Sequence, residues 1–86
     1  MVGATTLAFV LINSETGAEE EIMEQLVKID GVKEAYSVYG VYDLIVKVEA
    51  PDLEKLKEIV HTKIRRIDKV RSTLTMIAFE ERRGKG

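Results

Sequence analysis

The 86-residue sequence contains no cysteine, no tryptophan, one proline and a single histidine. Without cysteine it can form neither a disulfide nor a thiolate metal site, and one histidine cannot form a histidine cluster. No long hydrophobic run occurs: the apolar stretch at residues 7–12 is far shorter than the roughly 20 residues of a membrane-spanning helix. A signal peptide has Lys or Arg before its apolar segment, but no Lys or Arg precedes this stretch. We therefore expect a cytoplasmic protein without metal, cofactor or membrane anchor.

The length of the chain predicts one small domain. We assign residues 1–80 to it and residues 81–86, which are mostly charged, to a flexible tail. Domains of this size bury only about 60% of the surface that the unfolded chain exposes. Because no disulfide can compensate, oligomerisation is the expected additional source of stability.

Charge is unevenly distributed along the chain. Residues 1–54 carry 11 acidic and 3 basic side chains, a net charge of −8, whereas residues 55–86 carry 4 and 10, a net charge of +6. Two solvated helix surfaces of opposite sign explain this pattern. The alternative is head-to-tail attraction between neighbouring subunits, which would favour rings over simple dimers.

Hydrophobic periodicity predicts the order strand, helix, strand, strand, helix, strand. The strands are expected at residues 4–12, 32–39, 43–50 and 71–79. The first helix is expected to begin with a capping box formed by Thr16 and Glu19 and to end near residue 30, before Gly31. The second is expected at residues 53–67, after Pro51 and a cap at Asp52. The expected inner stripes are Ile22, Met23, Leu26, Val27 and Ile29 on the first helix, and Leu53, Leu56, Ile59, Val60, Ile64 and Ile67 on the second.

One internal repeat is visible. Residues 29–32, Ile-Asp-Gly-Val, recur as Ile-Asp-Lys-Val at residues 67–70, an offset of 38 positions. The chain is then two strand–helix–strand halves, which predicts an α+β, ferredoxin-like βαββαβ fold. Its four-stranded antiparallel sheet has two helices on one face. Because residues 7–12 are apolar without alternation, we expect the uncovered face to pair sheet-to-sheet with a second copy as a dimer.

The stretch between the second and third strands contains Gly40 and Asp43. Glycine tolerates positive φ and aspartate can accept hydrogen bonds from backbone N–H groups, so we expect a tight hairpin turn. All three tyrosines of the chain, Tyr36, Tyr39 and Tyr42, lie on this hairpin. A tyrosine ring with its hydroxyl suits interfaces and the walls of small-ligand sites. The hairpin tip is therefore either a simple turn or a subunit contact beside a small-molecule site.

Hydroxyl side chains gather on the last strand, at Ser72, Thr73 and Thr75. Threonine is a common strand residue and needs no function there. The functional interpretation is that these hydroxyls hydrogen-bond the amino and carboxylate groups of an amino acid. The sequence leaves open whether this row faces the helices or the opposite side of the sheet.

Catalysis and direct nucleic-acid binding are not expected. His61 stands on the second predicted helix without a nucleophile at helical spacing, and no phosphate-binding glycine motif occurs. RNA-recognition domains of the same topology carry aromatic stacking residues on the third strand, but residues 43–48 contain none. No helix-turn-helix segment is available for DNA, because both helices are needed to cover the sheet.

Three segments together resemble a known family. They are Asp-Gly-Val-x-x-Ala-Tyr at residues 30–36, Gly-Val-Tyr-Asp-Leu at residues 40–44 and Ile-Asp-x-Val-x-Ser-Thr-x-Thr at residues 67–75. In this order, over about residues 7–79, they resemble the effector domain of the Lrp/AsnC transcription regulators. This domain is also called the regulation-of-amino-acid-metabolism domain. Full regulators carry an N-terminal helix-turn-helix, whereas this chain begins at the first strand, so it looks like a stand-alone effector module.

The resemblance also implies an assembly and a site. Domains of this family pair sheet to sheet, the dimers assemble into rings, and amino-acid effectors bind between dimers against the hairpin loop. Carried over to this sequence, the implied ligand-binding residues are Gly40, Val41, Tyr42 and Asp43 in the loop and Thr73 and Thr75 on the last strand. Tyr39 stands where many members have a small hydroxyl residue.

The expected function is accordingly an amino-acid effector-sensing and oligomerisation module, not an enzyme. A full-length Lrp/AsnC-type regulator is the expected partner besides a second copy. One alternative is an enzyme of the dimeric α/β-barrel type, but those need pockets lined by His, Asn or Trp, and the strands here are aliphatic. The other is a purely structural oligomerisation domain.

Overall fold

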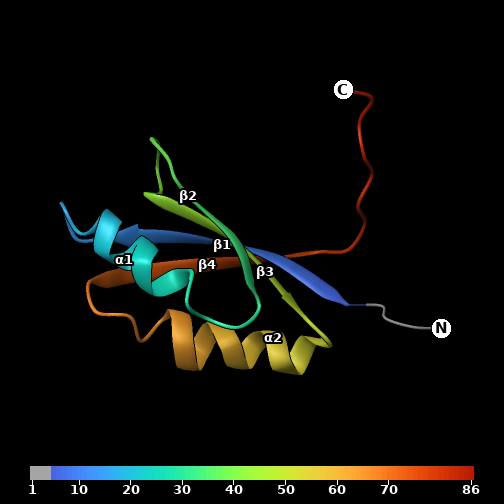
Figure 1. The fold of residues 1–86 in the computed structure, drawn as a ribbon, viewed down its shortest axis with the longest axis horizontal. Helices are drawn as coiled ribbons and strands as arrows, with labels where there is room; N and C mark the ends of the chain where they lie inside the picture. Colours follow the sequence, from blue (N-terminus) through green and yellow to red (C-terminus); the bar gives the residue numbers. More distant parts are fainter. Residues whose placement is uncertain (1–4) are drawn as a thin grey trace.

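Four antiparallel strands form one sheet, and both helices lie on the same side of it (Figure 1). The computed structural model describes residues 5–86. Along the sheet the strand order is β2-β3-β1-β4. The elements are β1 (Thr6–Ser14), α1 (Glu19–Leu26), β2 (Val32–Ser37), β3 (Leu44–Ala50), α2 (Leu53–Ile59), which continues as the π-helical turn η1 (Val60–Ile64), and β4 (Val70–Ala78). The predicted ferredoxin-like βαββαβ arrangement is confirmed.

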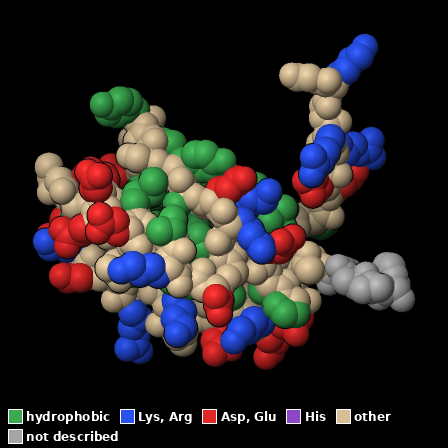
Figure 2. Space-filling model, viewed as in Figure 1, with side chains coloured by type: hydrophobic (Ala, Val, Ile, Leu, Met, Phe, Trp, Pro, Cys, Tyr) green, Lys and Arg blue, Asp and Glu red, His purple; other side chains and the backbone are tan. Residues whose placement is uncertain are grey.

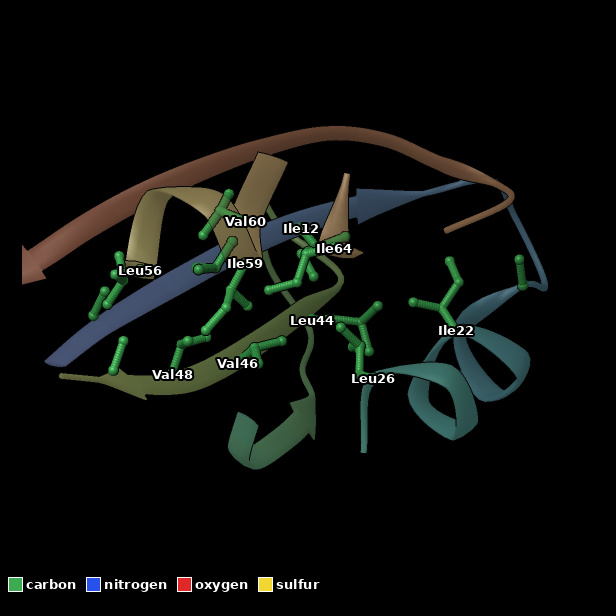
Figure 3. Close-up of a cluster of buried hydrophobic side chains, with 14 residues drawn as sticks. Ile12, Ile22, Leu26, Leu44, Val46, Val48, Leu56, Ile59, Val60 and Ile64 are labelled. Atoms are coloured by element: carbon green, nitrogen blue, oxygen red, sulfur yellow. The ribbon is translucent and has the colours of Figure 1, made fainter. Parts of the chain in front are cut away.

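The core lies between the sheet and the helices (Figure 3). Alternate residues of the two central strands point into it, because successive strand side chains face opposite sides. On β3, Leu44, Val46 and Val48 are fully buried, as the alternation in the sequence predicts. The helices contribute mainly their inner stripes. The buried helical side chains are Ile22, Leu26, Leu56, Ile59, Val60 and Ile64.

The face of the sheet away from the helices remains open. Leu11 pairs with Leu74 and Phe9 with Met76, and paired residues of neighbouring strands share a face. Phe9 and Leu11 are half-buried, whereas Leu74 and Met76 are 46% and 47% exposed. β1 is thus apolar on both faces, as predicted, but only one of them is covered within the chain.

The first helix differs from its prediction at both ends. The residue before it is Ala18, and no side chain caps it. The Ala18 N–H donates to the Glu15 carbonyl at 3.1 Å, so Thr16 lies inside a turn and the predicted capping box is wrong. The Val27 N–H still donates to the Met23 carbonyl, four residues back, but the Lys28 and Ile29 N–H groups donate to carbonyls three residues back, which tightens the chain into turns and ends the helix at Leu26. Val27, predicted to face the core, is 62% exposed.

The second half of the chain follows the prediction more closely. The Asp52 carboxylate accepts a hydrogen bond from the Lys55 N–H at 2.8 Å, which confirms the predicted cap. The helix stripe is confirmed at its centre, but Leu53, the first residue of α2, is 42% exposed. Helical structure ends at Ile64, short of the predicted residue 67.

The internal sequence repeat is also present in the backbone conformation. Gly31 has φ +99°, and Lys69, at the equivalent position of the second half, has φ +75°. A Cβ at Gly31 would lie 2.9 Å from Ile59 Cδ1 and 3.1 Å from the Glu49 carbonyl oxygen. Only glycine therefore fits between β3 and α2 at this point. Lys69 adopts the same strained conformation with a side chain present.

The ends of the chain complete the comparison. Ala4, the predicted start of the first strand, lies outside the described residues, while β4 ends at Ala78, one residue before its prediction. Residues 79–86 have no regular secondary structure and run away from the sheet (Figure 1); the flexibility of the tail stays a prediction. No helix within residues 5–86 has the length and apolarity needed to cross a bilayer.

Candidate functional site

The connection between β2 and β3 is a hairpin loop that projects from one end of the sheet (Figure 1). The Val38 N–H donates to the Asp43 carbonyl at 2.9 Å and closes the loop around residues 39–42. This loop is longer than the tight turn that the sequence predicted. Gly40 has φ +156°, a value that other residues rarely adopt. Tyr39 is fully exposed and Val41 is 86% exposed, so the tip offers apolar surface to solvent.

Asp43 fixes the base of this loop to the central strand β1. Its Oδ2 atom accepts hydrogen bonds from the Ser14 N–H at 2.8 Å and from the Ser14 hydroxyl at 3.4 Å. Its own N–H donates to the Ile12 carbonyl at 2.9 Å. We expected Asp43 to bond N–H groups of the hairpin, but the N–H that it bonds belongs to β1. Three hydrogen bonds therefore hold the loop against the end of β1, where the pairing with β4 is also irregular.

The predicted threonines lie on the helix side of the sheet. Thr73 pairs with Ile12 and Thr75 with Val10, both of which are fully buried beneath the helices. The threonines themselves are half-buried, because β4 is an edge strand that the helices cover only in part. β1 lies between them and β3, the strand into which the loop leads, and this puts Thr73 about 10 Å from the Leu44 backbone at a strand spacing of about 4.8 Å. One chain alone therefore does not bring the threonines and the loop into one pocket.

Two adjoining hollows border the loop and the start of α1. One, of about 410 Å³, is lined by Glu19, Ser37, Val38, Tyr39 and Asp43. The other, of about 380 Å³, is lined by Gly17, Glu19, Glu20, Met23 and Ser37. Their volumes lie in the range of small-molecule sites. The charged groups that line them are all carboxylates, which suits a ligand with a positively charged group at this position.

Other titratable side chains show no catalytic arrangement within residues 5–86. His61 is exposed and lies 3.4 Å from Arg65 Nη1 through its Nδ1 atom. The Tyr36 hydroxyl donates to Glu34 at 2.7 Å, and this hydrogen bond raises the pKa of the tyrosine. No group of three or more His, Asp or Glu side chains is positioned to hold a metal ion in that range.

Sequence reasoning missed two residues of this region. Ser14 looks like part of a turn in the sequence, yet it is the buried partner of Asp43. Glu19 looks like half of a capping box, yet it lines both hollows. No local pattern marks either role, because both depend on contacts between distant segments of the chain.

Comparison with known proteins identifies the domain. The family model of the Lrp/AsnC ligand binding domain matches residues 7–84. An uncharacterised HTH-type transcriptional regulator of Pyrococcus furiosus is 40% identical over 77 residues, which are 86% of this chain and 51% of the regulator. The chain thus spans about half the length of the curated regulators it matches.

Solved structures agree with the sequence comparison. A hypothetical protein from Pyrococcus horikoshii is 47% identical with a TM-score of 0.82, over 88% of this chain and 92% of that protein. AsnC from E. coli is 26% identical with a TM-score of 0.87, over 94% of this chain but 55% of AsnC.

Enzymes also occur among the similar proteins. The homocitrate synthase of Sulfolobus acidocaldarius is 38% identical over 60 residues, but these are 13% of the enzyme. These 60 residues are 70% of this chain, so the likeness to the enzyme is confined to a segment of domain size, whereas the match to the P. furiosus regulator covers 86% of this chain and half of the regulator. By its family model, its relatives and its fold, the chain belongs to the Lrp/AsnC family and contains the ligand-binding domain of those transcription regulators.

Proposed function

We propose that this protein is an amino-acid effector-sensing and oligomerisation module without catalytic activity. The observation that carries the proposal is the hairpin loop, which is held rigidly at its base by Asp43 and exposed at its tip, beside a hollow of about 410 Å³. A loop with a fixed base and an exposed tip is suited to bind a ligand through its backbone and to contact a neighbouring subunit at the same time. In this proposal Gly40, Val41, Tyr42 and Asp43 form one wall of the site.

An amino acid is the proposed ligand class. A Neisseria meningitidis transcriptional regulator with the same fold, at 15% identity and a TM-score of 0.83, was solved as a complex with L-Met. The hollow beside the loop presents carboxylates to which an α-ammonium group can donate. Thr73 and Thr75 enter the site from a neighbouring dimer, since within one chain β1 separates them from the loop and neither lines the hollow beside it.

Assembly is the proposed output. The open face of the sheet carries Phe9, Leu11, Leu74 and Met76, and an exposed apolar surface of this kind marks an interaction site. Two copies pair through it, and dimers join further into rings. A ligand that bridges two dimers stabilises the assembled state by a free energy that grows with the logarithm of its concentration relative to its Kd. The proposed partner that receives the signal is a full-length regulator of the same family, which this protein would bind in the cytoplasm.

Adjacent residues of β4 provide a matched test of the pairing. Met76 lies on the open face and Ile77 on the helix side, yet they are 47% and 45% exposed. Met76→Glu is expected to convert dimers to monomers in sedimentation velocity runs, because it buries charge in the proposed interface. Ile77→Glu should leave dimers intact. If both variants sediment as the wild type does, the open face is not the interface.

A thermal-shift screen tests ligand binding. An amino acid present at about 100 times its Kd is expected to stabilise the protein by about 2.7 kcal/mol, which is readily seen as a raised Tm. If none of the common amino acids raises the Tm at millimolar concentration, the sensing proposal fails. Dimerisation by the wild type would then support the structural oligomerisation domain instead.

A further inference from the structure

A second hollow with an unusual charge arrangement lies between the two helices, away from the hairpin loop. It has a volume of about 370 Å³. α1 supplies one wall with Glu21 and Glu24, and the end of α2 supplies the other with Lys63 and Arg66. Figure 2 shows acidic side chains gathered near α1 and basic side chains near the end of α2. Gln25, Ile67 and Asp68 complete the lining.

Each charged pair borders the groove. Glu21 and Glu24 are three positions apart on α1, and residues three apart on an α-helix are neighbours on its surface. Lys63 lies in η1, and Arg66 lies in the turn that follows it. The half-buried Ile67, which follows Arg66 in sequence, contributes apolar surface to the same hollow. The groove therefore has one anionic wall, one net cationic wall on which Lys63 and Arg66 outnumber the single carboxylate of Asp68, and an apolar contact.

The opposite charges are close enough to line one hollow but do not neutralise each other across it. Within residues 5–86 no ion pair links Glu24 to Lys63 or to Arg66. Glu21 is bonded elsewhere, to the Lys69 ammonium at 3.2 Å. An inserted molecule that carries both charges can pair with the two walls at once. A molecule with one charge pairs with one wall and leaves the other unmatched.

The π-helical turn contributes to the shape of the cationic wall. The Arg65 N–H donates to the Val60 carbonyl at 2.9 Å, five residues back, which widens the helix at Val60–Ile64. A widened turn shifts the residues after it around the helix axis, and such turns are frequent at functional sites. Lys63 lies inside this turn and Arg66 two residues beyond its end. The irregularity thus falls where the wall of the groove is built.

We propose that this groove is a binding site for a small zwitterion of the α-amino acid class, separate from the site at the hairpin loop. The ammonium group of the ligand faces Glu24, its carboxylate faces Lys63 and Arg66, and its side chain contacts Ile67. Since every charged wall residue is solvent-exposed, binding is weak and sensitive to salt. This inference does not depend on the function proposed for the loop.

Amide shifts in NMR titrations with L-methionine test the location. Shifts at residues 21–25 and 63–68 that saturate support the proposal. Shifts confined to residues 38–43 overturn it and leave the loop site standing, and no shift at tens of millimolar overturns it as well. N-acetyl-L-methionine lacks the ammonium charge and L-methionine methyl ester lacks the carboxylate. Each should bind about three- to tenfold more weakly at the groove.

Two charge-removing variants test the walls. Glu24→Gln and Arg66→Gln are each expected to weaken groove binding about three- to tenfold. The matched controls are Glu54→Gln and Lys57→Gln, which lie on exposed positions of α2 and do not line the groove. They should bind L-methionine as the wild type does. Equal affinity in all four variants would overturn the assignment of the walls.

Discussion

Removal of the Asp43 carboxylate tests the claim that this residue anchors the hairpin loop. In Asp43→Ala the Ser14 N–H loses its acceptor at 2.8 Å, and Ser14 is only 8% exposed. A buried donor left without a partner costs about 1–3 kcal/mol. We therefore expect the free energy of unfolding to fall by about 2 kcal/mol. For a domain of this size that corresponds to a Tm lower by roughly 10 °C.

Urea unfolding at one fixed protein concentration measures this loss, because the stability of an oligomer depends on concentration. Ser14→Ala keeps the N–H donor and loses only the 3.4 Å hydroxyl contact, so its cost should stay below about 1 kcal/mol. Asp30→Ala, an exposed aspartate outside the site, serves as the control. If Asp43→Ala is as stable as Asp30→Ala, the hydrogen bonds to β1 do not anchor the loop.

Further predictions concern the backbone and the charges outside the loop. Gly31→Ala should lose about 2–4 kcal/mol in urea unfolding, because it combines positive φ with a Cβ 2.9 Å from a side-chain carbon of α2. Gly17→Ala, at φ +84° but with nothing within 4 Å, should lose only about 1–2 kcal/mol, and equal losses would contradict the steric argument. Asp52→Ala should lose about 1 kcal/mol with the α2 cap, and an unchanged urea midpoint would show that the cap does not matter. Glu21 raises the pKa of Lys69 above its ordinary value of 10.5. The ion pair therefore stabilises the folded state fully below pH 10.5, and this stabilisation is lost as the pH rises through the folded-state pKa of Lys69. Lys69→Met should accordingly be less stable than wild type at neutral pH, with a difference that shrinks above about pH 10.5; a difference independent of pH would exclude the ion pair.

Local periodicity was sufficient to predict the fold. The alternation of Leu44, Val46 and Val48 is a property of neighbouring residues, and it correctly identified the buried face of β3. The repeat at an offset of 38 positions identified the two halves, and the positive φ values of Gly31 and Lys69 show that it extends to the backbone. These signals need no knowledge of which segments meet in space.

Errors arose where a tertiary contact or a competing turn decided the outcome. The capping box at Thr16 failed because the Ala18 N–H bonds the Glu15 carbonyl and forms a turn before the helix. The partner of Asp43 could not be predicted, because Ser14 lies 29 positions away in the sequence. The sequence could not show on which face of the sheet Thr73 lies, because that depends on how β4 pairs with β1.

The central claim is that an amino acid bound at the loop controls the assembly of dimers built through the open sheet face. Sedimentation velocity at low micromolar concentration, with and without each amino acid that raises the Tm, tests it most directly. We predict dimers without ligand and a larger ring with at least one of these amino acids. A monomer under both conditions, or a size distribution that no amino acid changes, would contradict the account.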